Sequence, residues 1–460
     1  MQKLARHEID FTHGSLLKKL IIVAIPLILT NILQLLFNAA DVAIVGIFDG
    51  DDAVAAVGAN SALINVIINL FVGLGAGASV VLAKYVGQND LERSRKLVGT
   101  AVFLSIIIGI ALSFVGIFGA KTFLTWMNCD PLILDKAVLY LQIYFVGMPI
   151  IMLYNFSAGL LRAVGDTLRP MIFLLISGVI NVGLNIFFVA VCKLSVAGVA
   201  IATVASQVVS AVCALVIMIK GTGFSKLSFK HFKLYKSELK EIVKVGLPSG
   251  IQSSMFSISN VIIQSTVNTF MKVATTANAV AQQFDSIVAM TGNGVALATM
   301  SIVSQNYGAK QDKRITKSIV IGALSALAVD LFFGIIFIIL GQALCLIMTQ
   351  DPAVIELALV RMNILCATFC LGGIMEVLTY SLRSLGKSTT AMIMSIIFVC
   401  LFRVLWINTF YKLNPTFAMI FYSYPISWAL SIIADIAILV PTIKKFKRLI
   451  LKEKCNDSHC

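Results

Sequence analysis

The sequence predicts an all-α polytopic membrane protein with twelve transmembrane helices in two pseudo-symmetric six-helix lobes. Composition, a series of long apolar segments and an internal repeat support this fold class. Of the 460 residues, 59% are hydrophobic and only 13% are charged, about half the charged fraction of a soluble domain. At roughly 20 apolar residues per crossing, the chain has room for about a dozen spans. A water-soluble enzyme is therefore disfavoured.

Twelve apolar segments follow one another, separated by connectors that are charged or contain Pro or Gly. They are residues 18–45, 53–83, 97–119, 137–161, 170–190, 196–219, 242–270, 274–304, 318–346, 354–382, 389–411 and 417–442. The first segment follows a basic start but is longer than a signal-peptide core, and no small-residue cleavage site follows it. We expect it to stay in the mature chain.

The basic residues fall mainly on one side of the predicted membrane. With the N-terminus inside, 29 of the 36 Lys and Arg lie in segments expected to be cytoplasmic. By the positive-inside rule this predicts a multi-pass protein of the cell (inner or plasma) membrane, in contact with lipid, with both termini in the cytoplasm. The net charge of +14 then needs no nucleic-acid partner, since only 220–244 approaches a basic patch with aromatics.

The two halves of the chain align when one is shifted by 221 residues. The aligned pairs include Gly73 with Gly294, Gly87 with Gly308, Arg93 with Arg314, Asp130 with Asp351, Arg162 with Arg383, and Gly165 with Gly386. Pro26 meets Pro248 after a shift of 222. These matches predict a duplication. Six spans per half is an even number, so both halves should enter the membrane in the same direction around a central cavity.

The repeat divides the chain into four expected regions. They are an N-terminal six-helix lobe (1–220), a basic cytoplasmic linker (221–241), a C-terminal six-helix lobe (242–442) and a cytoplasmic tail (443–460). We expect the chain to act as a monomer.

The first span carries a polar stripe. Asn31, Gln34, Asn38 and Asp41 are spaced by 3, 4 and 3 residues, which places them on one helical face. Comparable faces occur on spans 2, 5 and 6: Ser61, Asn65 and Asn69; Ser177, Asn181 and Asn185; Thr203, Ser206, Gln207 and Ser210. Polar side chains inside spans must face other helices or water.

This group of one carboxylate among amides and hydroxyls suits Na⁺ or a proton as a coupling ion at Asp41. The alternative is that the amides only fasten helices together. An unpaired charge in a span costs several kcal/mol, so we expect the protonation of Asp41 to be coupled to conformation. No other metal or cofactor is expected.

The C-terminal lobe offers a second polar site. Its candidates are Asn260 and Gln264 in span 7, Gln282 and Asp285 in span 8, and Glu376 in span 10. Asp285 and Glu376 would contact substrate or hold a second ion. Alternatively, either carboxylate would pair with Arg361 or Arg403.

Pro26 precedes the polar stripe of span 1 by more than one turn. A proline removes a backbone hydrogen bond and permits a bend. Pro26 is therefore a candidate gating residue with Pro248 as its counterpart, although a kink without function is an equal alternative.

Several segments resemble the multidrug and toxic compound extrusion (MATE) family, in particular its DinF-like branch. They are Pro26 with NAADVAIVG at the end of span 1, VGQND at 86–90 echoed by SQNYGAK at 304–310, and LRAVGDTLRP at 161–170 echoed by LRSLGK at 382–387. The resemblance covers nearly all twelve spans. It implies a V-shaped antiporter that exports cationic or amphipathic organic compounds, antibiotics and other xenobiotics among them, in exchange for H⁺ or Na⁺.

The resemblance also implies a cation site at Asp41, Asn181, Asn185 and Thr203. The chain departs from the DinF-like pattern at Asn185, where an Asp is usual, so one carboxylate is lost. Either Asp41 alone carries the coupling charge, with Asn185 as a neutral ligand, or coupling has moved to the C-terminal carboxylates. We favour the first.

Two other functions are weighed against export. A lipid-linked saccharide flippase of the related superfamily would need a more basic cavity, and only Arg361 and Arg403 lie well inside spans. A membrane-embedded enzyme is disfavoured because no span carries a histidine or a nucleophile beside a base.

Overall fold

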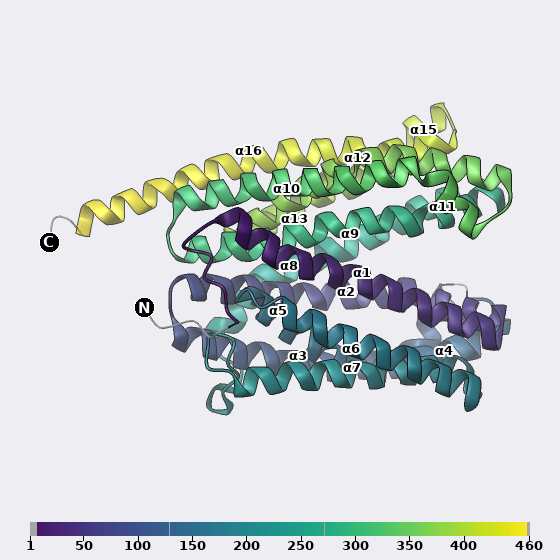
Figure 1. The fold of residues 1–460 in the computed structure, drawn as a ribbon, viewed down its shortest axis with the longest axis horizontal. Coiled ribbons are helices and arrows are strands. Elements are labelled where there is room, and N and C mark those ends of the chain that lie inside the picture. Colours follow the sequence, from purple (N-terminus) through teal and green to yellow (C-terminus); the bar gives the residue numbers. More distant parts are fainter. Residues whose placement is uncertain (1–6, 128, 271, 458–460) are drawn as a thin grey trace. The chain divides into compact units, whose positions relative to one another are not determined.

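The computed structural model describes residues 7–127, 129–270 and 272–457, which form a succession of helices (Figure 1). In the first half these are α1 (Leu16–Asp49), α2 (Asp51–Gly87), α3 (Leu91–Trp126), α4 (Pro131–Val146), α5 (Met148–Ala163), α6 (Leu168–Asn185), η1 (Ile186–Val191) and α7 (Ser195–Lys220). They are followed by η2 (Phe229–His231), α8 (Lys236–Val267), α9 (Lys272–Gly308), α10 (Asp312–Ile339), α11 (Gly341–Met348), α12 (Pro352–Ser384), α13 (Ser388–Ser395), η3 (Ile396–Leu401), α14 (Phe402–Asn408), α15 (Phe410–Leu413) and α16 (Phe417–Asp457).

Each apolar segment predicted from the sequence corresponds to one or more helices, although residues 268–270 of the segment 242–270 lie beyond the end of α8. Among the described residues, ten helices are long and apolar enough to cross a membrane, or eleven if α4 and α5, bent by 52° at their junction, form one span. The predicted span at 242–270 corresponds to α8, which has 32 residues. α8 is not among the helices apolar enough to cross a membrane because it contains many serines, glutamines and asparagines, although its length of about 48 Å is sufficient.

The chain divides into two compact units. The first unit holds the described residues up to Asp10 together with Leu29–Ser254. The second holds Phe11–Ile28 and the described residues from Met255 onward. The division runs through helices α1 and α8, so each of these helices contributes one part to each unit.

The repeated Asp-Pro pair starts a helix in each unit. Asp130 caps α4, where its Oδ1 accepts the backbone N–H of Leu132 at 2.9 Å. Asp351 caps α12 in the same way, accepting from the N–H of Ala353 at 3.0 Å. The proline that follows each cap needs no hydrogen-bond partner for its nitrogen. The repeat therefore preserves a helix start.

The repeated Leu-Arg pair leads into a tight turn that both units share. Gly165 has φ 86° and Gly386 has φ 77°, a left-handed conformation that a glycine adopts without steric cost. Asn89 and Lys310, which also align at the offset of 221, have φ 57° and 56°. The duplication thus extends to backbone conformation.

In the first unit, α2 and α8 meet through glycines. A Cβ on Gly73 would collide with the backbone of Gly250, and one on Gly77 would collide with the backbone of Gly246. Residues without side chains let two helix backbones approach closely. The small-residue run of span 2 is therefore a packing surface.

In the described part of the chain, one π-helical segment occurs in each unit. η1 starts directly after Asn185 at the end of α6, and η3 starts directly after Ser395 at the end of α13. Each has 6 residues. π turns are rare in helices and frequently occur at functional sites, and here they adjoin the segments that carry Asn185 and Arg403.

Candidate functional site

The carboxylate of Asp41 on α1 is the centre of a polar cluster in the first unit. Its Oδ1 accepts a hydrogen bond of 2.5 Å from the Nδ2 of Asn185 on α6. The same Nδ2 donates to the Oδ1 of Asn181, one turn earlier, at 3.2 Å. The Oγ1 of Thr203 on α7 lies 3.4 Å from the Oδ2 of Asp41 and 3.5 Å from the Nδ2 of Asn181. The structure thus brings these four residues into contact.

Asp41 faces a cavity of about 430 Å³ within the first unit. The polar residues that line it are Gln34, Asn38, Asp41, Ser61, Asn65, Asn69, Tyr140, Tyr144, Asn155, Ser177, Asn181, Thr203, Ser206 and Gln207. Within the described part of the chain, no lysine, arginine or histidine is among the lining residues. Asp41 is therefore the charged side chain of this cavity.

Asn185 contacts Asp41 from the protein interior. Its side chain is fully buried and does not line the cavity. Its Oδ1 has no hydrogen-bond partner among the described residues. A buried amide oxygen beside a carboxylate is an oxygen ligand of the kind that hard cations prefer.

The polar stripe of span 1 is mostly in the cavity wall. Gln34, Asn38 and Asp41 line the cavity, whereas Asn31 is not among its lining residues. The sequence reasoning missed Tyr140 and Tyr144, which line the wall from α4. Their spacing of four residues on one apolar segment was the available signal.

Asp285 on α9 and Arg361 on α12 form a buried ion pair in the second unit. The Nε of Arg361 lies 2.7 Å from the Oδ2 of Asp285, and the side chains of Arg361 and Asp285 are 9% and 3% exposed. Arg361 also donates through Nη1 to the Oδ1 of Asn278. Asn278 in turn donates to the Oε1 of Gln264 at 2.7 Å. Of the partners that the sequence left open for Asp285, Arg361 is the one observed.

This ion pair borders a cavity of about 190 Å³. Its polar lining consists of Asn260, Gln264, Asn278, Gln282, Asp285, Ser286, Arg361 and Tyr424. Four of the predicted residues of the second polar site are therefore together in one wall.

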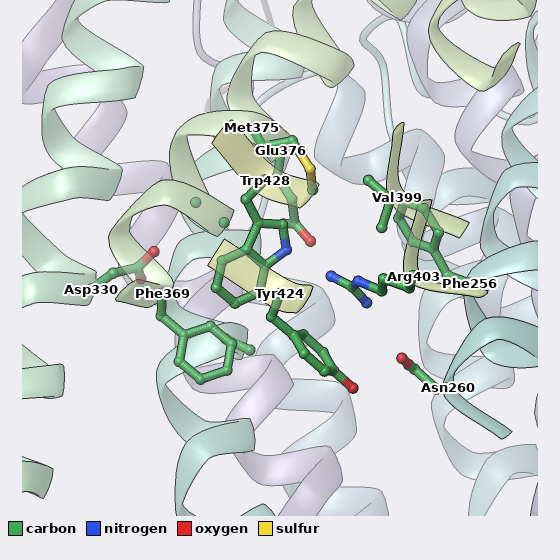
Figure 2. A pocket seen from close by; sticks show the side chains of 13 residues that line it. Phe256, Asn260, Asp330, Phe369, Met375, Glu376, Val399, Arg403, Tyr424 and Trp428 are labelled. Atoms are coloured by element: carbon green, nitrogen blue, oxygen red, sulfur yellow. The ribbon is translucent and has the colours of Figure 1, made fainter. Parts of the chain in front are cut away.

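Glu376 on α12 lines an adjacent cavity of about 170 Å³ (Figure 2). Its Oε2 accepts a hydrogen bond of 3.0 Å from the Nδ2 of Asn293, which also donates to the hydroxyl of Tyr380 at 3.1 Å. Arg403 and Asn260 line the same cavity. Among the described residues Glu376 and Arg403 form no ion pair, unlike Asp285 and Arg361.

Two further carboxylates of the second unit are hydrogen-bonded to threonines. The Oδ1 of Asp330 on α10 accepts from Thr291 at 2.9 Å, and the Oδ2 of Asp435 on α16 accepts from Thr379 at 2.8 Å. Both aspartates are 1% exposed or less. Each bond joins two different helices, so no spacing along the chain could have identified it.

Pro26, the candidate gating residue, lies inside α1, which continues as one helix from Leu16 to Asp49. Pro248 has the corresponding position inside α8. Both helices thus carry a proline in the interior, where the i→i−4 hydrogen bond of that residue is missing.

The family model described as MatE matches residues 26–187 and again 248–409. Both matches begin at the interior prolines, which confirms the duplication predicted from the sequence.

Individual relatives and a solved structure extend this similarity. The chain is 28% identical to "Probable multidrug resistance protein YpnP" of Bacillus subtilis over 307 residues, 66% of this chain and 68% of that protein. It is 26% identical to "Probable multidrug resistance protein NorM" of Thermotoga maritima over 384 residues, 83% of this chain and 82% of that protein. The structure described as "Outward-facing conformation of a multidrug resistance MATE family transporter of the MOP superfamily" superposes with a TM-score of 0.91 at 20% identity. The superposition covers 97% of this chain and 100% of that chain. The predicted fold class is confirmed.

Proposed function

The chain belongs to the MATE family, whose members are transporters and not enzymes, and on that premise we propose that it is a secondary active multidrug exporter. Its substrates would be cationic or amphipathic organic compounds, moved in exchange for H⁺ or Na⁺. The observation that carries the proposal is Asp41, a carboxylate that faces a cavity with no basic residue in its described lining.

The free-energy cost of a charged Asp41 inside a span makes this carboxylate suitable for coupling ion binding to transport. A carboxylate inside a span is costly unless it is paired, and the residues around Asp41 supply neutral donors only. A proton or a Na⁺ ion would remove the charge, and the amide and hydroxyl oxygens of Asn181 and Thr203 would complete the coordination of Na⁺.

Asn185 suits both states of such a site. In the structure its Nδ2 donates to the Oδ1 of Asp41, as it would to the charged carboxylate, and its Oδ1 has no partner among the described residues. A half rotation of the amide would turn the oxygen toward a protonated carboxyl or a bound cation. Asn185 would therefore act as a neutral partner of one titrating carboxylate, with Asp41 as the sole coupling charge.

A saccharide flippase is not favoured as the alternative. A lipid-linked pyrophosphate needs basic side chains, and within the described lining the cavity of the first unit has none. Two of the similar proteins are instead described as probable multidrug resistance proteins.

The proposal is tested with the variant Asp41→Asn in proteoliposomes that contain ethidium. An imposed H⁺ or Na⁺ gradient, each applied alone, should drive ethidium transport by the unmodified protein. Asp41→Asn should lower gradient-driven transport at least about a hundredfold, because the coupling charge is removed. Asp135→Asn, which removes a carboxylate from α4 of the same unit, outside the lining of the cavity, should transport normally. Undiminished transport by Asp41→Asn would reject the proposal.

The variant Asn185→Asp tests the single-charge mechanism. It places a second carboxylate against Asp41, so two charges need neutralisation in each cycle. The dependence of transport on the driving cation should steepen from first order toward second order. An unchanged dependence would mean that position 185 lies outside the coupling site.

A further inference from the structure

We propose that the Arg403 cavity, the 170 Å³ cavity of the second unit that Arg403 and Glu376 line, binds an aromatic compound through a single carboxylate or a comparable anionic group. The inference goes beyond the proposed export of cations. It concerns binding and does not depend on coupling at Asp41.

Arg403 is a buried cation that forms no ion pair with any described residue. Its side chain is 5% exposed. Its Nε donates to the Oγ of Ser427 at 3.1 Å. Among the described residues, no carboxylate pairs with the guanidinium. An arginine side chain stays protonated in proteins, so the positive charge persists in this cavity.

Two aromatic rings hold the guanidinium in place. Its carbon lies 3.9 Å from the ring centroid of Tyr424 and 5.9 Å from that of Trp428. Figure 2 shows the guanidinium above the Tyr424 ring, pointing toward Trp428 among the residues that line the cavity. Stacking and the Ser427 hydrogen bond fix the planar group, so little further freedom is lost when its terminal nitrogens bind a partner.

Arg361 provides an internal comparison. It lies in the same unit and is 8% exposed, but it is paired with Asp285 at 2.7 Å. A buried ion needs such a partner because removal from water costs several kcal/mol. The guanidinium of Arg361 contacts a carboxylate, whereas that of Arg403 faces a cavity. Among the described residues no carboxylate pairs with Arg403, so a bound anion would supply its partner.

The carboxylates of the cavity wall have other partners. Glu376 accepts from Asn293, and Asp330 accepts from Thr291. Among the described residues neither forms an ion pair with Arg403, and their presence in the wall would repel a ligand with several negative charges. The ligand is therefore a monoanion. A forked guanidinium recognises a carboxylate in particular because both can form two parallel hydrogen bonds.

The remaining wall accommodates an aromatic body. Phe256, Phe369, Tyr424 and Trp428 line the cavity and surround the guanidinium in Figure 2. Rings of this kind bind apolar and aromatic groups through burial and edge or face contacts. A compact aromatic acid satisfies both the charge and the walls.

Three probes with one ring system separate charge from shape: 2-naphthoate, the neutral 2-naphthamide and 2-naphthylmethylammonium. Binding to the full-length protein in nanodiscs is measured by calorimetry, with protein-free nanodiscs as the blank. The unmodified protein should bind 2-naphthoate at least tenfold more tightly than 2-naphthamide. Arg403→Gln should weaken the binding of 2-naphthoate at least tenfold, because a charge-assisted hydrogen bond is lost. The affinity for 2-naphthamide should change by less than about twofold.

Two variants complete the experiment. Arg403→Lys keeps the charge but loses the fork, so its affinity for 2-naphthoate should be intermediate. Lys412→Gln removes an exposed charge of the same unit and should leave all three affinities unchanged. Equal binding of 2-naphthoate and 2-naphthamide by the unmodified protein would overturn the proposal without any variant. So would undiminished 2-naphthoate binding by Arg403→Gln, or a preference for the ammonium probe that Glu376→Gln abolishes.

Discussion

The cavities of the two units share a duplicated frame and differ in charge. The first unit has one charged residue in its described cavity wall, Asp41, among amides, hydroxyls and tyrosines. The walls of the second unit contain Asp285, Asp330, Arg361, Glu376 and Arg403. With the offset of 222 that aligns Pro26 with Pro248 in the same helix, the position of Asp41 is Ile263 in the second unit. Duplication has therefore preserved caps and turns, which determine folding, while the cavity side chains diverged.

The largest effect should come from breaking the ion pair of the second unit. Arg361→Gln leaves Asp285 charged and buried, which should lower the free energy of unfolding by about 3–5 kcal/mol. Thermal unfolding in detergent measures this loss. The double variant Asp285→Asn with Arg361→Gln should recover most of it, because no charge is then left alone. A single variant as stable as the unmodified protein would show that the pair contributes no structural stability.

The shared turn after the Leu-Arg pair should respond to pH in one unit only. Asp166 occupies this turn in the first unit and is 5% exposed, and burial raises its pKa to about 6 from 3.8. The folded protein thus holds this proton more tightly than the unfolded chain does. The contribution of Asp166 to the free energy of unfolding should therefore fall by about 2 kcal/mol as pH rises from about 4 to about 6, then stay constant.

The variant Asp166→Asn should remove this pH dependence and stabilise the protein at pH 7. Thermal unfolding between pH 4.5 and 7.5 measures the change. Lys387, the exposed residue at the aligned position of the second unit, supplies the control variant Lys387→Gln, which should keep the slope. If the unfolding temperatures of Asp166→Asn and the unmodified protein change equally with pH across this range, the Asp166 carboxyl does not cause the pH dependence.

The smallest effect should come from the hydroxyl beside Asp41. The Oγ1 of Thr203 lies 3.4 Å from the carboxylate but 2.9 Å from the carbonyl of Val199, so its proton is directed mainly to the backbone. Thr203→Val should raise the cation concentration for half-maximal transport by about two- to tenfold. An increase of this concentration above a hundredfold would instead make Thr203 a principal ligand and sharpen the contrast between the units.

The sequence was informative where a pattern lies along one helix. The apolar segments, the repeat and the polar stripes of α1 and α6 follow from spacing, and Asp41, Asn181 and Asn185 meet as the spacing suggests. The Asp-Pro caps and the glycine turn are local and were visible as motifs. These features depend on neighbours within about one helical turn.

Pairings between helices were not accessible in the same way. The sequence offered Arg361 and Arg403 as equal partners of two carboxylates, and the structure pairs Arg361 with Asp285 and leaves Arg403 facing a cavity. The bend between α4 and α5 lies at Gly147 and Pro149 and had a local signal, whereas the division of α1 and α8 between units arises from packing. Such choices depend on three-dimensional distances that no periodicity encodes.

The glycine contact between α2 and α8 limits how the first unit can rearrange. Gly73 and Gly77 meet Gly246 and Gly250 backbone to backbone, so no rotamer change can loosen or tighten this seam. The two helices can alter their contact only by sliding or rolling as rigid rods. Movement of α2 against α8 would therefore depend on these glycines, and even one added methyl group would hinder it by a clash with the opposite backbone.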